Sequence, residues 1–234
     1  KGYAYYVAFR DTGDFTDRLV AEVLEKAGVE FTVLAKEPAS GAQLDFLIGA
    51  ANETKEQMSA CAKAFSEFKT VVVYDPADAK AAKQTFGEYS VETSAKVVTY
   101  TSFVASLIKE NKLELQRSEQ AVVFQDPYQL ARDLGETEEP REIIMNCAVL
   151  GEMLLNRGET VWAGNLLMAQ YIPDVMKKVA ARRIFNAQSV GMNTIVYPAT
   201  FGGDPAPGAS MVLISSILAI VTMPIMFMLF NIPV

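Results

Sequence analysis

The chain of 234 residues contains no histidine. Histidine is the usual general base beside a nucleophilic serine or cysteine, a common axial ligand of haem and a frequent ligand of zinc. Its absence therefore excludes the Ser-His and Cys-His nucleophile systems, haem ligation through imidazole and the usual zinc sites.

Cysteine and basic residues are also scarce. The only cysteines, Cys61 and Cys147, lie in segments whose pattern predicts helices, and we expect them to be small buried hydrophobic side chains. Two cysteines with no evident pairing suggest a reducing compartment or indifference to redox state. The 21 Lys and Arg against 28 Asp and Glu give a net charge of −7, which argues against a nucleic acid partner.

Charge is missing altogether from residues 205–234. About 22 helical residues span the ~30 Å hydrocarbon core of a bilayer, so the apolar stretch 209–230 predicts a transmembrane helix. The alternative is a buried hairpin within a larger soluble assembly. Basic residues precede this stretch and none follows it, which predicts a membrane-associated protein with the bulk of the chain in the cytoplasm: Lys177, Lys178, Arg182 and Arg183.

The hydrophobic pattern alternates between amphipathic segments and short β-branched runs. This alternation predicts an α/β fold with mostly parallel sheets covered by helices. The predicted strands are Tyr3–Ala8, Phe31–Leu34, Thr70–Tyr74, Lys96–Tyr100, Ala121–Phe124, Met153–Leu155 and Thr194–Tyr197. The predicted helices are Phe15–Ala27, Glu53–Phe68, Ala77–Gly87, Tyr100–Asn111, Pro140–Cys147 and Pro173–Val190.

Short stretches recur in two rounds along this pattern. They are 6–9, 36–41 and 73–78 in the first round, and 125–132, 160–164 and 195–200 in the second. Ser40 and Asp75 are 35 positions apart, and Ala163 and Tyr197 are 34 apart. The agreement predicts one unit duplicated at a period of about 123 residues, which suits a pseudo-twofold pair.

Together with four flanking motifs, these stretches resemble the cysteine-rich CCG domain of the heterodisulfide reductase B subunit. The glycolate oxidase and anaerobic glycerol-3-phosphate dehydrogenase iron–sulfur subunits share that domain. The flanking motifs are Val23–Val29, the Asp-Pro-x-x-Leu-x-Arg of Asp126–Arg132, the Glu-Glu-Pro-Arg-Glu of Glu138–Glu142, and Asn156-Arg157. The resemblance covers residues 1–200 and implies CCG-like repeats at 1–115 and 116–203, with the apolar helix at 204–234.

The resemblance also implies iron–sulfur ligation, from which this chain departs. Cluster iron is held by cysteine thiolates. Here other residues stand at the expected ligand positions: Phe9, Ala39, Ser40, Asp75, Asp78, Tyr128, Trp162, Ala163, Tyr197 and Thr200. We therefore expect no cluster, no resident metal and no catalytic residues, and we expect Trp162, Tyr128 and Phe9 to be substantially buried and packed near Gly41 and Gly164.

The function implied is a catalytically degenerate, membrane-tethered subunit that docks onto other subunits of an electron-transfer complex. The alternative is an oxidoreductase subunit with a rebuilt site, in which Asp75, Asp78 and Asp126 coordinate a divalent cation or an organic cofactor fills the cavity. The simpler interpretation of Asp75-Pro76 is a helix cap.

Three further features leave alternatives open. The aromatic run Tyr3–Phe9 could stack on a quinone or flavin, although strand aromatics usually lie in the core. The acidic segment Glu136–Glu142 could face a partner protein or be a solvated helix start. Residues 192–205 and the apolar tail also resemble the end of auxin-efflux-carrier-type permeases, which implies a transporter fragment, although one or two spans cannot form a translocation path.

Overall fold

The computed structural model describes residues 3–6, 14–33, 37–164 and 166–201. The chain divides into two compact units. The first comprises Lys1–Leu150 and Leu155–Trp162, and the second comprises Gly151–Leu154 and Ala163–Val234. This division differs from the boundary at 115/116 that the sequence suggests, because residues 116–150 pack with the first unit.

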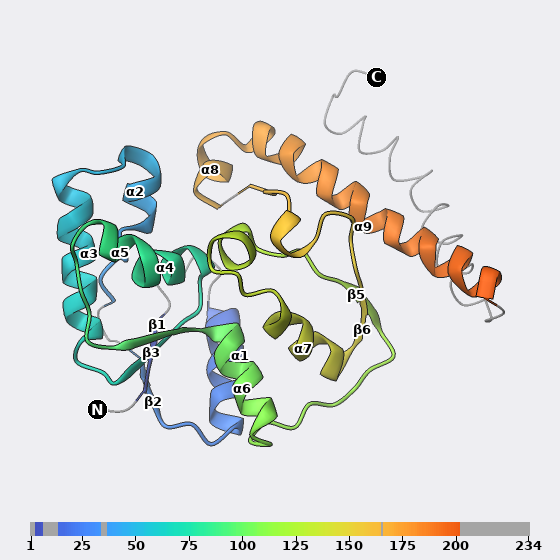
Figure 1. Cartoon of the computed structure of the whole chain (residues 1–234), viewed down its shortest axis with the longest axis horizontal. Coiled ribbons are helices and arrows are strands. Elements are labelled where there is room, and N and C mark those ends of the chain that lie inside the picture. Colours follow the sequence, from blue (N-terminus) through green and yellow to red (C-terminus); the bar gives the residue numbers. More distant parts are fainter. Residues whose placement is uncertain (1–2, 7–13, 34–36, 165, 202–234) are drawn as a thin grey trace. The chain divides into compact units, whose positions relative to one another are not determined.

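The first unit is built on a parallel sheet of four strands in the order β2-β1-β3-β4 (Figure 1). The strands are β1 (Tyr3–Tyr6), β2 (Phe31–Val33), β3 (Thr70–Val73) and β4 (Lys96–Thr99). In the register of the two later strands, Thr70 is opposite Lys96 and Val73 is opposite Thr99, so both end at the same edge. The predicted α/β class and parallel pairing are confirmed.

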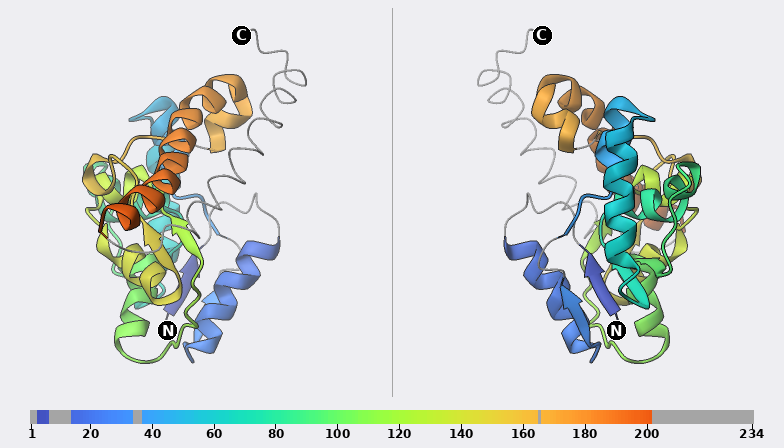
Figure 2. Two further views of the ribbon diagram at one scale, coloured as in Figure 1. Left: turned by 90° about the vertical axis from the view of Figure 1, so that its right-hand side faces the viewer. Right: turned by 90° about the vertical axis from the view of Figure 1, so that its left-hand side faces the viewer.

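Both faces of this sheet are covered by helices, as Figure 2 shows for α1 and α3. Alternate residues of β3 serve two cores: Val71 and Val73 belong to one, and Val72 to the other. The first core includes side chains from α3 (Asn52–Phe65), α4 (Pro76–Lys80), η1 (Ala81–Thr85) and α5 (Phe86–Glu88). The second includes side chains from α1 (Asp14–Lys26) and α6 (Tyr100–Lys109).

The two-residue period of β3 explains this division, because successive side chains of a strand point to opposite faces. Each fully buried valine stabilises the fold by about 1.5–3 kcal/mol relative to an exposed one. Strands and helices alternate along the chain, so the helices form βαβ crossovers that cover the parallel sheet on both sides.

The remaining elements of the first unit follow the sheet. A two-stranded sheet pairs β5 (Ala121–Val123) with β6 (Val149–Gly151), whose last residue belongs to the second unit. Between them lie η2 (Gln129–Asp133) and α7 (Glu138–Cys147), and η3 (Arg157–Glu159) comes later in the chain. Ile143 of α7 packs on the α1–α6 core, which attaches this segment to the first unit.

The second unit contains α8 (Leu166–Tyr171) and the long α9 (Pro173–Phe201). Met176 and Arg183 are buried on one side of α9, and Arg183 Nη1 donates a hydrogen bond of 2.9 Å to the carbonyl oxygen of Leu154. Val190 continues this buried stripe at the same seven-residue spacing. One face of the helix is thus fixed within its unit.

Two predicted strands are wrong. Thr194–Tyr197 lies within α9, since extending an existing helix adds a hydrogen bond per residue without a new nucleation cost. Met153–Leu155 is not a strand; the strand is Val149–Gly151, and Leu155 has a left-handed φ of 57° that no strand allows.

Two other predictions concern single segments. Cys61 is buried in α3 as expected, and Cys147 of α7 is only partly buried. No helix among the described residues is both long and apolar enough to cross a membrane, and the predicted span 209–230 lies outside those residues.

Candidate functional site

The candidate site lies at the carboxyl edge of the parallel sheet. The chain leaves β2 toward Ser40, β3 toward Asp75 and Asp78, and β4 at Thr99. In open α/β sheets this edge is where ligands bind, because the loops that leave the strands converge there. Two of the six repeated stretches, 36–41 and 73–78, therefore meet at this edge of the sheet.

Ser40 and Asp78 are in direct contact, although 38 positions separate them. Ser40 Oγ donates a buried hydrogen bond of 2.5 Å to Asp78 Oδ1 and accepts one of 3.1 Å from the backbone N–H of Ala42. The side chains are 3% and 5% exposed. The contact joins the second and third stretches of the first round at positions where the resemblance implies cluster ligands.

The second carboxylate oxygen of Asp78 is buried and has no hydrogen-bond partner among the residues that the structure describes. Burial raises the pKa of the Asp78 carboxyl to about 7, the Asp75 and Glu37 charges add to the rise, and the hydrogen bond from Ser40 opposes it. An acid with such a pKa is largely protonated in mildly acidic solution and can exchange a proton near neutrality.

Asp75 has a structural role. It is the N-cap of α4, where its Oδ1 accepts hydrogen bonds of 2.7 Å from Ala77 N–H and 3.3 Å from Asp78 N–H. Pro76 occupies the first position of the helix, where its missing N–H costs nothing. The helix-cap interpretation of Asp75-Pro76 is confirmed.

Gly41 forms the tight turn beside Ser40. Its φ is +82°, and a Cβ at this position would lie 2.7 Å from Met58 Cγ. Only glycine combines this conformation with so close a neighbour. Met58 is fully buried in α3 and fills the space next to the turn.

A related turn occurs at Gly164 in the second unit. Its φ is +102°, and a Cβ there would lie 3.1 Å from the sulfur of Met176. Gly41 is followed by a short helix, α2 (Ala42–Ile48), and by α3, which supplies Met58. Gly164 is likewise followed by a short helix, α8, and by α9, which supplies Met176. The two turns thus share a local order of glycine, short helix and longer methionine-bearing helix.

Methionine side chains are the nearest neighbours of the two glycine turns, Met58 at Gly41 and Met176 at Gly164. Trp162 and Tyr128 are partly buried, and the Tyr128 ring centroid lies 5.2 Å from the Arg132 guanidinium carbon. Packing of these aromatic side chains near Gly41 and Gly164 stays a prediction. Of the other expected positions, Ala39 is exposed and Ala163 is partly buried.

Three expected ligand positions give no side-chain information. Phe9 lies outside the described residues. Tyr197 and Thr200 belong to α9, and the structure does not describe their side chains. The third stretch of the second round is consequently helical where the resemblance implies a strand and loop.

Glu136 links the loop after η2 to the sheet edge. Its carboxylate accepts hydrogen bonds from the Thr99 hydroxyl, from Ser102 Oγ at 2.7 Å and from Lys83 Nζ at 2.7 Å. Burial alone would raise the pKa of Glu136, but these three donors outweigh it and hold the pKa below its ordinary value. Within the acidic segment Glu136–Glu142, the Glu136 side chain therefore links a loop to the sheet edge and is not simply solvated.

A second buried network joins the motifs that follow β5. Arg141 binds Asp126 through two hydrogen bonds of 2.6 and 2.8 Å, and both side chains are 1% exposed. Asp126 also accepts from Arg157 N–H at 2.9 Å, and Thr160 donates to the Asp126 carbonyl. Burial alone would raise the pKa of Asp126, but Arg141 and the Arg157 N–H hold it below its ordinary value.

This network bears on the proposed carboxylate metal site. Arg141 already neutralises Asp126, so Asp126 does not join Asp75 and Asp78 as a third ligand. Among residues 3–6, 14–33, 37–164 and 166–201, no three acidic or cysteine side chains are placed to hold a metal ion. The residues present also do not fit an iron–sulfur cluster. Cluster iron requires thiolates, whereas these positions hold the Ser40 hydroxyl and the Asp78 carboxyl, which are hydrogen-bonded to each other.

Two surface hollows lie away from these positions. One of about 740 Å³ is lined by residues of the α1–β2 turn, the starts of β3 and β4, and α6. The other, of about 430 Å³, lies beside η1 and α5 and includes Lys83 and Phe86. Neither includes Ser40, Asp75 or Asp78.

Sequence reasoning missed Glu136 and Arg141 as the centres of buried networks. Arg141 could have been found from its motif, because a buried Pro-Arg pair in a helix start usually requires a carboxylate partner. Met58 and Met176 carried no signal, since neither lies in a repeated stretch. Comparisons with protein-family models, curated proteins and solved structures find no match to this chain.

Proposed function

We propose that the chain is a non-catalytic, membrane-tethered subunit with a CCG-like arrangement, which serves as a docking component of an electron-transfer complex. It would associate with other subunits of that complex and with the bilayer through 209–230. No cluster and no resident cofactor are part of this proposal.

The observation that carries the proposal is the contact between Ser40 and Asp78. The resemblance requires these two distant positions to be neighbours, because they would ligate one cluster. Their hydrogen bond is consistent with that arrangement and replaces ligand chemistry with a protein contact. In this proposal, the side chains at two positions that would hold a cluster in the family instead hold a loop to a helix.

Two further observations support a duplicated frame. The turns at Gly41 and Gly164 share positive φ, a following short helix and a covering methionine. The Asp-Pro, Pro-Arg and Asn-Arg motifs of the second round also meet in one network around Asp126. A frame retained around altered ligand positions suits a subunit selected for its surface rather than for redox chemistry.

Metal analysis combined with co-purification tests the proposal. The full chain, extracted anaerobically in mild detergent from its source membranes, should bring redox-active subunits with it, and the chain separated from them should contain iron and acid-labile sulfide far below one per chain. The matched control is the same extract after the partners are dissociated, because any iron should then leave with them. Stoichiometric iron that remains with the isolated chain would contradict the proposal.

A rebuilt enzymatic site is the second candidate, and Asp78 is the observation that favours it. A buried carboxyl with an unpartnered oxygen and a pKa of about 7 is suited to proton exchange with a bound organic molecule. A coloured or mass-detectable small molecule that is retained by the wild-type chain and lost in Asp78→Asn, with unchanged assembly, would favour this candidate over a docking subunit.

A further inference from the structure

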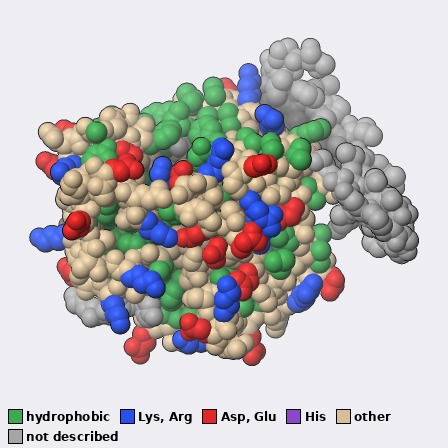
Figure 3. All heavy atoms as spheres, in the orientation of Figure 1, with side chains coloured by type: hydrophobic (Ala, Val, Ile, Leu, Met, Phe, Trp, Pro, Cys, Tyr) green, Lys and Arg blue, Asp and Glu red, His purple; other side chains and the backbone are tan. Residues whose placement is uncertain are grey.

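The outward face of α9 combines large apolar side chains with positive charge. Val175, Ile184 and Phe185 are 50%, 58% and 68% exposed, and Tyr171 just before the helix is 73% exposed. Figure 3 shows apolar side chains gathered over α8 and the start of α9. Met176, Arg183 and Val190 occupy the opposite, buried face, so the exposed apolar residues do not contribute to the core of their own unit.

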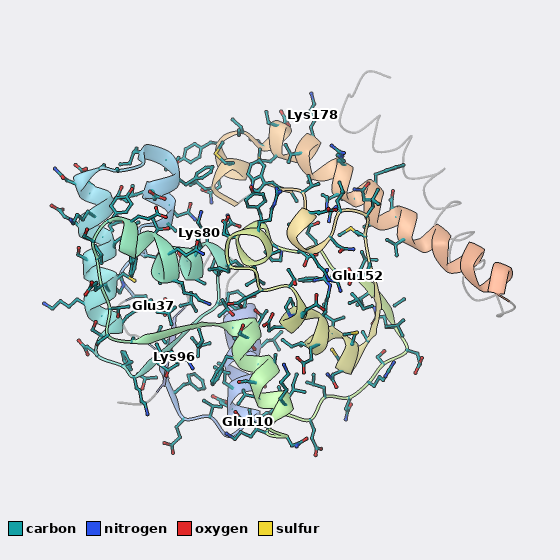
Figure 4. The ribbon with its side chains drawn as sticks, in the orientation of Figure 1. Glu37, Lys80, Lys96, Glu110, Glu152 and Lys178 are labelled. Atoms are coloured by element: carbon teal, nitrogen blue, oxygen red, sulfur yellow. The ribbon has the colours of Figure 1, made fainter. Side chains whose placement is uncertain are left out.

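The charge of this helix is opposite to that of the whole chain. Residues 175–203 contain four basic and no acidic residues, whereas the chain carries a net charge of −7. Three of the basic residues, Lys177, Lys178 and Arg182, are exposed, and Figure 4 shows Lys178 pointing outward. Asp174 is the one acidic residue of α9, and it lies 3.7 Å from Lys177.

An exposed helical face of this composition matches one kind of surface well. Basic side chains are attracted to anionic lipid headgroups, and aromatic and aliphatic side chains insert into the boundary between headgroups and acyl chains. Long basic side chains can do both, since their methylene stems lie on apolar surface while the charged ends stay in water. A wholly apolar protein groove would offer no anionic group to these cations.

The position of α9 in the chain supports the same occupant. The helix ends at Phe201, and the charge-free stretch predicted to span the bilayer begins at 209. Eight residues reach at most about 29 Å, so a tail in the bilayer keeps the end of α9 close to the membrane surface. We infer that the outward face of α9 lies on the anionic headgroup surface of a bilayer, an inference that rests on the membrane tether proposed above.

A tryptophan on α9 reports this contact directly. The full chain with Phe185→Trp in a Trp162→Phe background is reconstituted into vesicles of phosphatidylcholine, or of an equal mixture with phosphatidylglycerol, each containing brominated acyl chains. Phe46→Trp in the same background is the matched control, because Phe46 is 55% exposed on α2 of the first unit. Circular dichroism confirms that each variant is folded.

We expect the fluorescence emission of Phe185→Trp to shift to shorter wavelength and to be quenched in the anionic vesicles, with little change for the control. Replacing Lys177, Lys178 and Arg182 by Gln should reduce the ratio of docked to undocked helix by roughly fivefold per charge, on the order of a hundredfold in all. High salt should reduce the quenching in the same direction, because it screens the attraction.

The outcomes separate this inference from the proposed tether. If the Phe185→Trp chain floats with both kinds of vesicle in a density gradient but its fluorescence remains unquenched, the inference about α9 is wrong and the tether stands. If it floats only with anionic vesicles and its fluorescence is quenched there, the α9 surface is supported and the tether is wrong. If a co-purified acidic protein shields the Phe185→Trp side chain and neither lipid does, the face binds a protein and the inference is overturned.

Discussion

Replacing Asp78 by Asn should remove a pH dependence from the stability of the first unit. The pKa of Asp78 is raised from 3.8 to about 7 in the folded chain, chiefly by burial. The folded state therefore holds a proton that the unfolded state loses between these two values, and stability falls as the pH rises across that range. Below about pH 4 both states are protonated, and above about pH 7 both are ionised, so the loss is confined to the interval.

The magnitude follows from the size of the shift. One pKa unit corresponds to about 1.4 kcal/mol, so a shift of about three units costs about 4 kcal/mol above pH 7. An Asn at this position is neutral at every pH and retains an oxygen that can accept from Ser40. Its amide group introduces a constant cost of about 1–3 kcal/mol where Oδ2 has no partner, but a constant cost does not alter the slope.

The assay is urea unfolding of the full chain in mild detergent, followed by circular dichroism at intervals from pH 4 to pH 8. The stability of Asp78→Asn minus that of the wild type should rise by up to about 1.4 kcal/mol per pH unit between pH 4 and 7 and then become flat. Ser40→Ala is the companion variant, because loss of its hydrogen bond should raise the pKa of Asp78 further and extend the slope to higher pH. A difference that is flat from pH 4 to 7 would refute a buried, protonated Asp78.

Three other substitutions test the networks around the site. Arg141→Ala should destabilise the chain by about 3–5 kcal/mol in urea unfolding, because it leaves Asp126 buried without its partner; a loss below about 1 kcal/mol would mean that the pair is solvated. Gly41→Ala should cost more than Gly28→Ala in the same assay, since both have positive φ but only Gly41 has a side chain within 4 Å; equal losses would contradict the close packing. Glu136→Gln should reduce the stability that the wild type loses as the pH falls below about 4.5, since the pKa of Glu136 is lowered in the folded state, while the contribution of Asp126 remains; an unchanged acid limb of the stability curve would count against the link to Thr99 and Lys83.

Much of the first unit could be predicted because its elements have strong periodic signals. The runs at Thr70–Val73 and Lys96–Thr99 are β-branched and short; the first is followed by the helix cap Asp75, and the second ends on the helix cap Thr99. Such local features agree with the final packing, so propensity and tertiary structure point to the same element. The predicted ends differ from the observed ones by only one or two residues in these strands.

The second round could not be predicted as well, because its local signals conflict with the helix that contains them. Thr194–Tyr197 is rich in β-branched residues, yet it continues α9, which begins at Pro173 and is already formed when it reaches this segment. Spacing predicts a duplication and its period, but spacing does not tell whether a segment forms a strand. The predicted superposition of the two halves therefore stays a prediction, supported locally by the turns at Gly41 and Gly164.

The Ser40–Asp78 contact shows how a buried carboxyl is accommodated at the edge of the sheet. The carboxyl groups of Asp75 and Asp78 lie three positions apart beside a low-dielectric core. Asp75 accepts hydrogen bonds from the backbone N–H groups at the start of α4, whereas burial favours the protonated form of Asp78 and the hydrogen bond from Ser40 opposes that preference. The same edge of the sheet is thus held together by a hydroxyl, a helix N-terminus and a carboxyl that binds a proton, and its stability depends on pH.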